Sequence, residues 1–132
     1  EDEIHPVAGV SGSCMLIRRE VIDQIGYLDE QFFAYQEDAD FCFRARKEGW
    51  QVVFFPKAQI IHYGGEGGSK IEPYRSIVVW HQSYFRYYRK NLAQKYFLLF
   101  NWFYYLVMFI KLFIALVVNF LRKDKIVSAR RP

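Results

Sequence analysis

The stretch Tyr35-Gln36-Glu37-Asp38-Ala39-Asp40-Phe41-Cys42-Phe43-Arg44 carries the strongest structural signal in this chain. Three carboxylates fall within one turn, and apolar and then basic residues follow as far as Gly49. Acidic residues at the start of a helix and basic residues at its end are the order that the helix dipole favours. The stretch therefore predicts a helix over residues 37–48 whose first turn carries a cluster of acids.

Shorter elements are expected on both sides of this helix. Residues 19–25 read as a short helix that ends at Gly26, a favoured residue after a last helical turn. Three strands are predicted, at residues 13–17, 52–55 and 60–62. A glycine-rich loop follows over residues 64–69 and either approaches a ligand or serves as a hinge.

The acidic helix start suggests proton-transfer chemistry. A hydroxyl group is a poor nucleophile, and a carboxylate such as Asp38 can take its proton as the hydroxyl attacks an activated substrate. Backbone N–H groups at a helix start favour the ionised carboxylate, whereas repulsion from Glu37 and Asp40 opposes it. Asp40 and Arg44 are four residues apart and can pair on the helix face. The alternative is that these acids only cap the helix and form a surface ion pair.

His62 is the second candidate site residue. It ends the predicted strand at residues 60–62, where side chains commonly enter a cleft at a sheet edge. A neutral imidazole there can bind a divalent cation beside carboxylates, although a hydrogen-bonded core histidine is the alternative. The sequence contains no HExxH motif, no CxxC pair and no Walker loop, so other metal and nucleotide classes have little support.

Length and composition set the class of protein. The chain has 132 residues, enough for one domain, and starts at Glu1 without a signal-like segment, so we expect the C-terminal part of a longer protein. The net charge of +4 suits a membrane surface or a phosphate-bearing substrate better than a nucleic acid, which we do not expect as a partner. The only cysteines are Cys14 and Cys42, which gives no disulfide framework.

The C-terminal third predicts two long helices. The first starts at Pro73 and is amphipathic, basic and aromatic to residue 95. The second lies in the apolar run 97–121, which is long enough to cross a bilayer. On a helical wheel Lys111 falls within a weak polar stripe with Asn101 and Tyr104. Basic residues flank both ends, which favours an in-plane or re-entrant helix over a single span. The alternative is a core helix.

Five short groups of residues follow one another along the chain in a characteristic order and at characteristic distances. They are Gly12-Ser13-Cys14-Met15-Leu16-Ile17-Arg18-Arg19, Gly26-Tyr27-Leu28-Asp29-Glu30-Gln31-Phe32-Phe33, Glu37-Asp38-Ala39-Asp40 with Arg44, Gly49-Trp50 and His62-Tyr63-Gly64-Gly65. Together they resemble the C-terminal half of a family 2 glycosyltransferase, most closely the bacterial rhamnosyltransferase-like and galactofuranosyltransferase-like enzymes. The resemblance implies an α/β fold: the C-terminal part of a Rossmann-like GT-A catalytic domain over residues 1–72, followed by long helices over residues 73–95 and 96–132.

The resemblance also implies site roles. A nucleotide-diphosphate sugar would be the donor and transfer would invert the anomeric carbon, with Asp38 as the base. His62 would help to hold the Mg²⁺ or Mn²⁺ that carries the donor diphosphate. Asp40 and Arg44 would bind the acceptor or order the helix. Glu37, Gly12 and Ser13 complete the expected substrate-binding set.

The same resemblance suggests where the enzyme works. We expect transfer of a sugar, rhamnose by preference, to a polyprenyl-diphosphate-linked or glycan acceptor at the cytoplasmic face of the bacterial inner membrane, in cell-surface polysaccharide synthesis. No Asp-x-Asp metal motif after a hydrophobic strand occurs upstream, so we expect the isolated segment to be inactive. The competing hypothesis is a non-catalytic, membrane-anchored binding or scaffold module.

Overall fold

The computed structural model describes residues 3–63 and 72–128. The chain divides into two compact units, Glu1–Tyr63 and Gly64–Pro132, and each is described by itself. The predicted glycine-rich loop at residues 64–69 lies outside the described residues.

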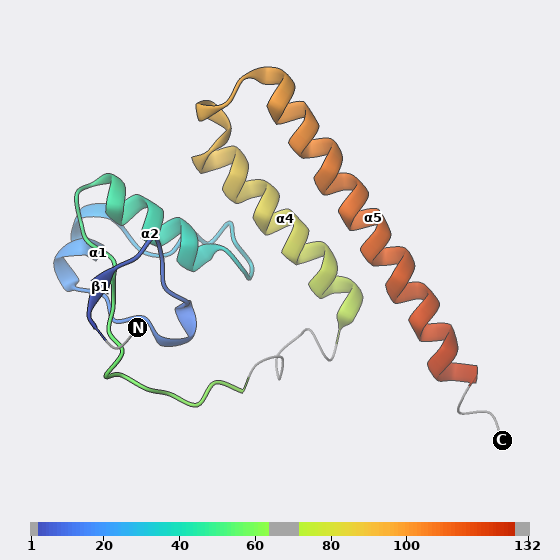
Figure 1. Ribbon diagram of the computed structural model, residues 1–132, viewed down its shortest axis with the longest axis horizontal. Coiled ribbons are helices and arrows are strands. Elements are labelled where there is room, and N and C mark those ends of the chain that lie inside the picture. The colour runs from blue at the N-terminus through green and yellow to red at the C-terminus, as the bar shows by residue number, and fades with distance from the viewer. Residues whose placement is uncertain (1–2, 64–71, 129–132) are drawn as a thin grey trace. The chain divides into compact units, whose positions relative to one another are not determined.

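The first unit is built from short elements (Figure 1). In chain order these are β1 (His5–Pro6), the 3-10 helix η1 (Gly12–Cys14), α1 (Arg19–Ile25), α2 (Glu37–Lys47) and β2 (Val53–Phe54). The two strands pair antiparallel, with His5 opposite Phe54 and Pro6 opposite Val53.

Both predicted helices of the first unit are confirmed. α1 has the predicted bounds, and Gly26 ends it with φ of 77° while its N–H donates to the Ile22 carbonyl at 2.8 Å. Glycine is favoured there because it has no Cβ to clash at positive φ. α2 begins at Glu37 as predicted and ends at Lys47, one residue early.

The strand predictions fare less well. Residues 52–55 do contain a strand, β2, but residues 13–17 and 60–62 form none, so both of those predictions are wrong. Part of the first segment instead belongs to η1 (Gly12–Cys14), which the Ser11 side chain caps. A strand needs a neighbour for its backbone N–H and C=O groups, and among the described residues only β1 and β2 supply each other with one. The described part of the chain is therefore mostly helical, with one small two-stranded sheet.

A small apolar core joins α1 to α2. Val21 packs against Phe41 and Ala45, and these three side chains are at least nine-tenths buried. Partly buried residues complete the cluster: Met15, Ile17, Ile22, Ile25 and Trp50. The apolar positions of the two helices thus fix the orientation of α2, and with it the direction of its acidic first turn.

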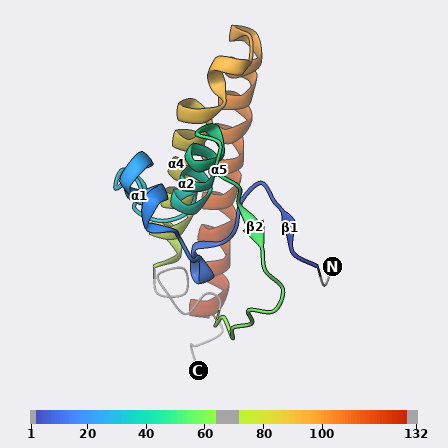
Figure 2. The same ribbon diagram turned by 90° about the vertical axis from the view of Figure 1, so that its left-hand side faces the viewer.

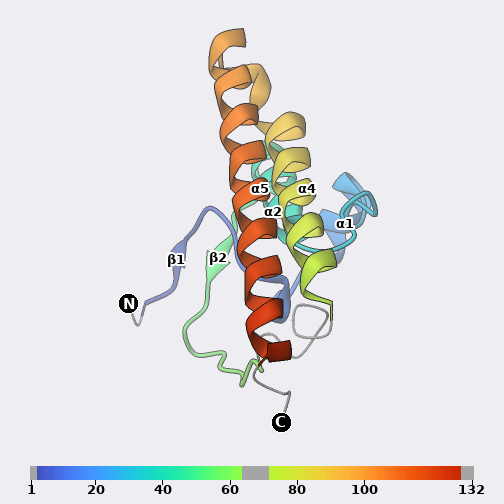
Figure 3. The same ribbon diagram turned by 90° about the vertical axis from the view of Figure 1, so that its right-hand side faces the viewer.

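The second unit is a helical hairpin. α4 (Pro73–Asn91) is followed by the 3-10 turn η2 (Ala93–Lys95) and by α5 (Leu98–Ser128), and the two helices lie side by side in all three views (Figures 1–3). Pro73 occupies the first turn of α4, as predicted. Tyr88 stacks on Tyr104 with ring centroids 3.7 Å apart, and Phe85 packs against Tyr105 at 4.9 Å.

Asn101 holds the turn of this hairpin. Its side-chain amide donates to the carbonyls of Ala93 and Tyr96, at 3.0 and 3.3 Å, while its oxygen accepts the Tyr88 hydroxyl. Carbonyls at the end of a helix lack partners within the helix, so these bonds fix the connection between α4 and α5. The weak polar stripe predicted from the helical wheel is therefore, at Asn101 and Tyr104, the side of α5 that faces α4.

Candidate active site

The chain enters α2 through a strained turn. Tyr35 and Gln36 both have positive φ, 66° and 70°, in a region that side chains other than glycine rarely adopt. Gln36 is the N-cap residue and makes no side-chain capping bond. Each such residue costs about 1–2 kcal/mol, and strain of this kind gathers at functional sites. The strain lies immediately before the acidic turn that the sequence singles out.

Asp38 is held by backbone groups on both of its oxygens. Oδ2 accepts the N–H of Gly12 at 2.8 Å and Oδ1 accepts the N–H of Ala39 at 2.7 Å. The first of these bonds ties α2 to η1 across 26 residues of sequence. Each carboxylate oxygen has two acceptor positions, so both oxygens keep one for a ligand. The two bonds fix the orientation of the carboxylate and leave each oxygen able to accept one more hydrogen bond.

Glu37 presents an unsatisfied oxygen beside Asp38. Its Oε2 atom is buried and has no hydrogen-bond partner among the described residues. A buried carboxylate oxygen without a partner is costly, and such groups in native structures call for an explanation. A hydrogen-bond donor on a bound substrate would satisfy this atom.

Asp40 and Arg44 form the predicted ion pair, but in the interior. Asp40 is completely buried, and its Oδ2 accepts from Arg44 Nε at 2.9 Å. The same guanidinium donates to the carbonyls of Ile25 and Tyr27, at 2.7 and 2.8 Å. Arg44 therefore clamps α2 to the end of α1 and the loop after it. Of the two roles predicted for this pair, the geometry describes the ordering one, because contact with an acceptor would require Asp40 to become exposed.

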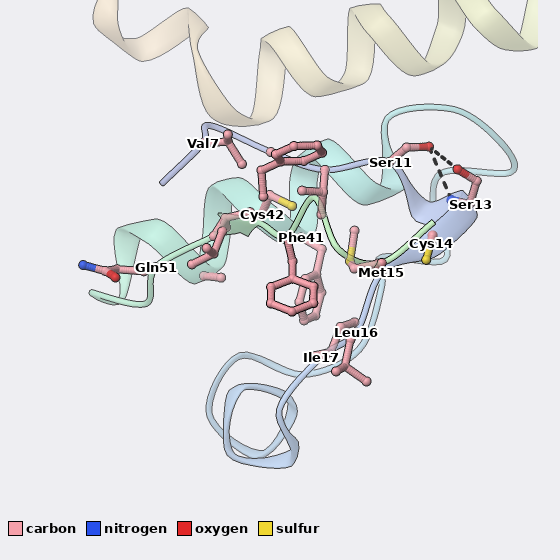
Figure 4. Close-up of a pocket in the computed structure, with 18 of the residues that line it drawn as sticks. Val7, Ser11, Ser13, Cys14, Met15, Leu16, Ile17, Phe41, Cys42 and Gln51 are labelled. Atoms are coloured by element: carbon pink, nitrogen blue, oxygen red, sulfur yellow. Dashed lines mark hydrogen bonds between the residues drawn. The ribbon is translucent and has the colours of Figure 1, made fainter. Parts of the chain in front are cut away.

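An open hollow of about 700 Å³ lies in the first unit (Figure 4). Its lining is largely apolar and includes Met15, Phe41 and Cys42. Ser11 and Ser13 stand at one edge with their hydroxyl oxygens 2.9 Å apart. This hollow offers a ligand both apolar surface and a polar edge.

The predicted site residues are only partly brought together by this hollow. His62 and Ser13 line it, whereas Glu37 and Asp38 are not among the described residues of its lining. Asp38 reaches its edge indirectly, because the N–H that it accepts belongs to Gly12, between the two lining serines. The structure thus groups Asp38 with Gly12, and His62 with the hollow, without placing both side chains in one cavity wall.

The donors for a divalent cation are incomplete. In residues 3–63 and 72–128 no three side chains of His, Cys, Asp or Glu gather closely enough to hold a metal ion. The side chains around His62 in the hollow are mainly apolar, whereas Mg²⁺ and Mn²⁺ require oxygen ligands. The described residues therefore do not fit a metal by themselves.

Cys42 is a buried thiol that lines the hollow. Burial raises the pKa of its thiol above the ordinary value of 9.0, and the nearby Asp38 carboxylate raises it further. A thiol that stays protonated is a poor nucleophile and a poor metal ligand. Cys42 therefore lines the hollow as a protonated, largely apolar group.

Two features were not predictable from the sequence: the strained turn and the full set of Arg44 contacts. Tyr and Gln are not residues that mark positive φ, as Gly, Asn and Asp do. The carbonyls that Arg44 holds belong to residues 17 and 19 positions away, and backbone groups of this kind leave no trace in a pattern of side chains.

Comparison with known proteins identifies the class. Residues 1–123 match the model of the glycosyl transferase family group 2. The chain belongs to this family, whose members share the GT-A fold.

Two relatives of known activity are similar to parts of the chain. One is the N-acetylglucosaminyl-diphospho-decaprenol L-rhamnosyltransferase of Mycobacterium tuberculosis, 36% identical over 83 residues, which are 63% of this chain and 27% of that protein. Another is the low-salt glycan biosynthesis hexosyltransferase Agl10 of Haloferax volcanii, 52% identical over 62 residues, 47% of this chain and 20% of that protein. The chain spans about a quarter of the length of these relatives. No solved structure matches it.

Proposed function

We propose that Asp38 is the general base of a glycosyltransferase that moves a sugar from a nucleotide-diphosphate donor to a hydroxyl of a lipid-linked or glycan acceptor. The single observation that carries this proposal is the fixed carboxylate of Asp38, whose two oxygens each accept a backbone N–H and keep a free acceptor position. Side-chain rotation is thereby restricted, which is what a base needs in order to meet a hydroxyl in one geometry.

The proposed reaction is a single displacement. The acceptor hydroxyl donates its proton to Asp38 as its oxygen attacks the anomeric carbon of the donor sugar. The bond from that carbon to the diphosphate oxygen breaks, and the nucleoside diphosphate leaves with the electron pair. Attack from the face opposite the leaving group inverts the anomeric carbon, which agrees with the use of one carboxylate as base rather than as nucleophile.

The neighbouring residues support this base in different ways. Glu37 Oε2, which is buried without a partner among the described residues, would accept a hydrogen bond from a second hydroxyl of the acceptor. Gly12 positions Asp38 through its N–H, and Ser13 places a hydroxyl at the rim of the hollow. The Asp40–Arg44 pair is a positioning device that holds the first turn of α2 against α1.

The relatives support a proposal for the donor sugar and the acceptor. The mycobacterial relative is named for transfer of rhamnose to a decaprenyl-diphosphate-linked N-acetylglucosamine. We infer that this chain serves the same class of reaction, with rhamnose or another hexose as the sugar and a polyprenyl-diphosphate-linked glycan as the acceptor. A lipid-linked acceptor calls for work at a membrane, and the cytoplasmic face is where nucleotide sugars are available.

The metal remains a separate part of the proposal. His62 is our candidate ligand for Mg²⁺ or Mn²⁺, but the described residues do not complete a site around it. Further oxygen ligands would have to come from outside these residues. No step of the proposed reaction is therefore derived through the metal.

The test is Asp38→Asn in the protein as the cell makes it, with transfer of nucleotide-activated rhamnose to a polyprenyl-diphosphate-linked acceptor as the assay. Loss of a general base should lower kcat by about 10²–10⁴-fold, with the KM for the donor nearly unchanged. The matched control is Asp23→Asn, which removes only an exposed carboxylate paired with Arg19 at 2.9 Å. A thermal melt of both variants shows whether the fold persists.

The scaffold hypothesis makes the opposite prediction. A membrane-anchored binding module would show the same cellular function with Asp38→Asn as with Asp23→Asn. Equal transfer rates in the two variants would remove Asp38 as the base. We also expect the 132-residue chain alone to transfer no sugar, and measurable transfer by it would contradict that part of the proposal.

A further inference from the structure

The outer face of α5 is an exposed apolar surface of the second unit. Trp102, Phe109 and Phe120 lie along it and are 66%, 67% and 57% exposed. The segment Leu98–Arg122 is long and apolar enough to cross a membrane, and none of its most apolar stretch is buried within the protein. A soluble protein rarely leaves so much contiguous apolar surface in water, so this face requires a cover.

The inner face of α5 has a different character. Lys111 is the only charged residue between Leu98 and Leu121, and its ammonium lies over the ring of Trp80, 4.3 Å from the ring centroid. Farther along, Tyr104 stacks on Tyr88. The single charge of the apolar run is thus turned toward α4 and away from the outer face.

α4 itself is basic. Arg75, Arg86, Arg89 and Lys90 are exposed on it, and it contains no acid. Phe85 contacts Tyr105, which is seven residues inside the apolar segment Leu98–Arg122. If α5 stood upright in a bilayer, the adjoining Arg86 would lie about 10 Å below the surface, where an arginine is costly. An upright α5 would therefore carry cations of α4 into the hydrocarbon.

We propose that the α4–α5 hairpin lies flat on a lipid bilayer, with the outer face of α5 in the interfacial layer and α4 on its aqueous side. Every residue class then has a suitable environment. The aromatic and aliphatic side chains of α5 enter the acyl boundary, where amphipathic interfacial helices bury their apolar face. Arg86 and Arg89, four and seven residues after Gln82 on the exposed side of α4, stay in water and outside the hydrocarbon. This inference does not depend on the proposed sugar transfer.

Depth measurement distinguishes a flat helix from an upright one. Nitroxide labels are placed at Trp102→Cys, Phe109→Cys and Phe120→Cys in the Cys14→Ser chain, where Cys42 is buried and unreactive. The chain is bound to phosphatidylcholine vesicles containing phosphatidylserine, and relaxation by oxygen and by a water-soluble nickel complex reports depth. A flat helix puts all three labels at one shallow depth. A spanning helix puts residue 109 about 10 Å deeper than residue 102, because seven residues separate them at 1.5 Å each.

The remaining outcomes also decide the matter. A label at Gln82→Cys, on the exposed side of α4, should be relaxed mainly by the nickel complex. Labels on α5 that are shielded from both reagents would mean that protein covers this face, for example a second copy of the chain. That result, or the 10 Å step in depth, would overturn the proposal.

Discussion

Replacement of Arg44 by methionine should destabilise the first unit severely. Arg44→Met keeps much of the side-chain length but removes the charge that faces the fully buried carboxylate of Asp40. The carbonyls of Ile25 and Tyr27 lose a donor in the same step. Removal of one partner of a buried ion pair costs about 3–5 kcal/mol. The Arg44 side chain is 21% exposed, which places the expected loss near the lower end, about 3 kcal/mol.

The expected change is large for a unit of this size. In a domain of 60–100 residues each kcal/mol lowers the midpoint of thermal unfolding by about 4–8 °C, so the variant should melt about 12–24 °C lower. Trp50 can report on this unit alone, because its indole donates to Gln24 Oε1 at 2.8 Å and packs against the core. Urea titrations would follow its fluorescence in a chain that also carries Trp80→Phe and Trp102→Phe.

The control and the double variant make the reasoning refutable. Arg19→Met breaks the ion pair to Asp23, which has the same length of 2.9 Å but is exposed, and should cost no more than about 1 kcal/mol. In Asp40→Leu with Arg44→Met no charge is left stranded, so at least about 1 kcal/mol of the loss should return. If Arg44→Met is no worse than Arg19→Met, or if the double variant is less stable than Arg44→Met, the clamp does not act as argued.

Three further predictions concern Cys42 in the wall of the hollow and the strained turn before α2. A thiol reagent should modify exposed Cys14 at once and buried Cys42 at least about 100-fold more slowly, through transient opening. Because burial raises the pKa of the Cys42 thiol above 9.0, the unfolded chain ionises first, and urea titrations should show stability lost as pH rises beyond about 9. Gln36→Gly should raise the stability of the first unit by up to about 1 kcal/mol in the same titration, because glycine accepts φ of 70° without strain. Gln51→Gly, at a residue without positive φ, should not, and a gain there of the same size would contradict the strain argument.

The helices were predictable because their signals are local. Gly26 ends α1, the acidic turn starts α2, and Pro73 starts α4, each through groups within a few residues. Strands depend on distant partners, and this is where the prediction failed. Ile60 and Ile61 are as apolar as β2, yet of the two segments only β2 has a described neighbour with which to pair. An apolar pattern alone cannot show whether that neighbour exists.

The polar stripe of α5 shows a second limit. The wheel correctly placed Asn101, Tyr104 and Lys111 on one side, but it could not show whether this side meets water, lipid or protein. The structure answers through contacts of α4 that no pattern in α5 contains, namely Tyr88 for the first two residues and Trp80 for the third. With that side taken by α4, the opposite face of α5 is the one that the proposed flat orientation turns toward lipid.

The geometry of the candidate site was not predictable from the sequence. The sequence marked Asp38 by its place in an acidic turn, whereas its bond to the Gly12 N–H arises only from the folded chain. The two strained residues before α2 belong to the same problem, because nothing in Tyr35 or Gln36 favours positive φ. Such a turn persists only where surrounding contacts outweigh its cost, and the Asp38–Gly12 bond and the Arg44 clamp are the contacts next to it. The strain and the fixed carboxylate are therefore two consequences of one arrangement, in which α2 is held so that its first turn faces η1.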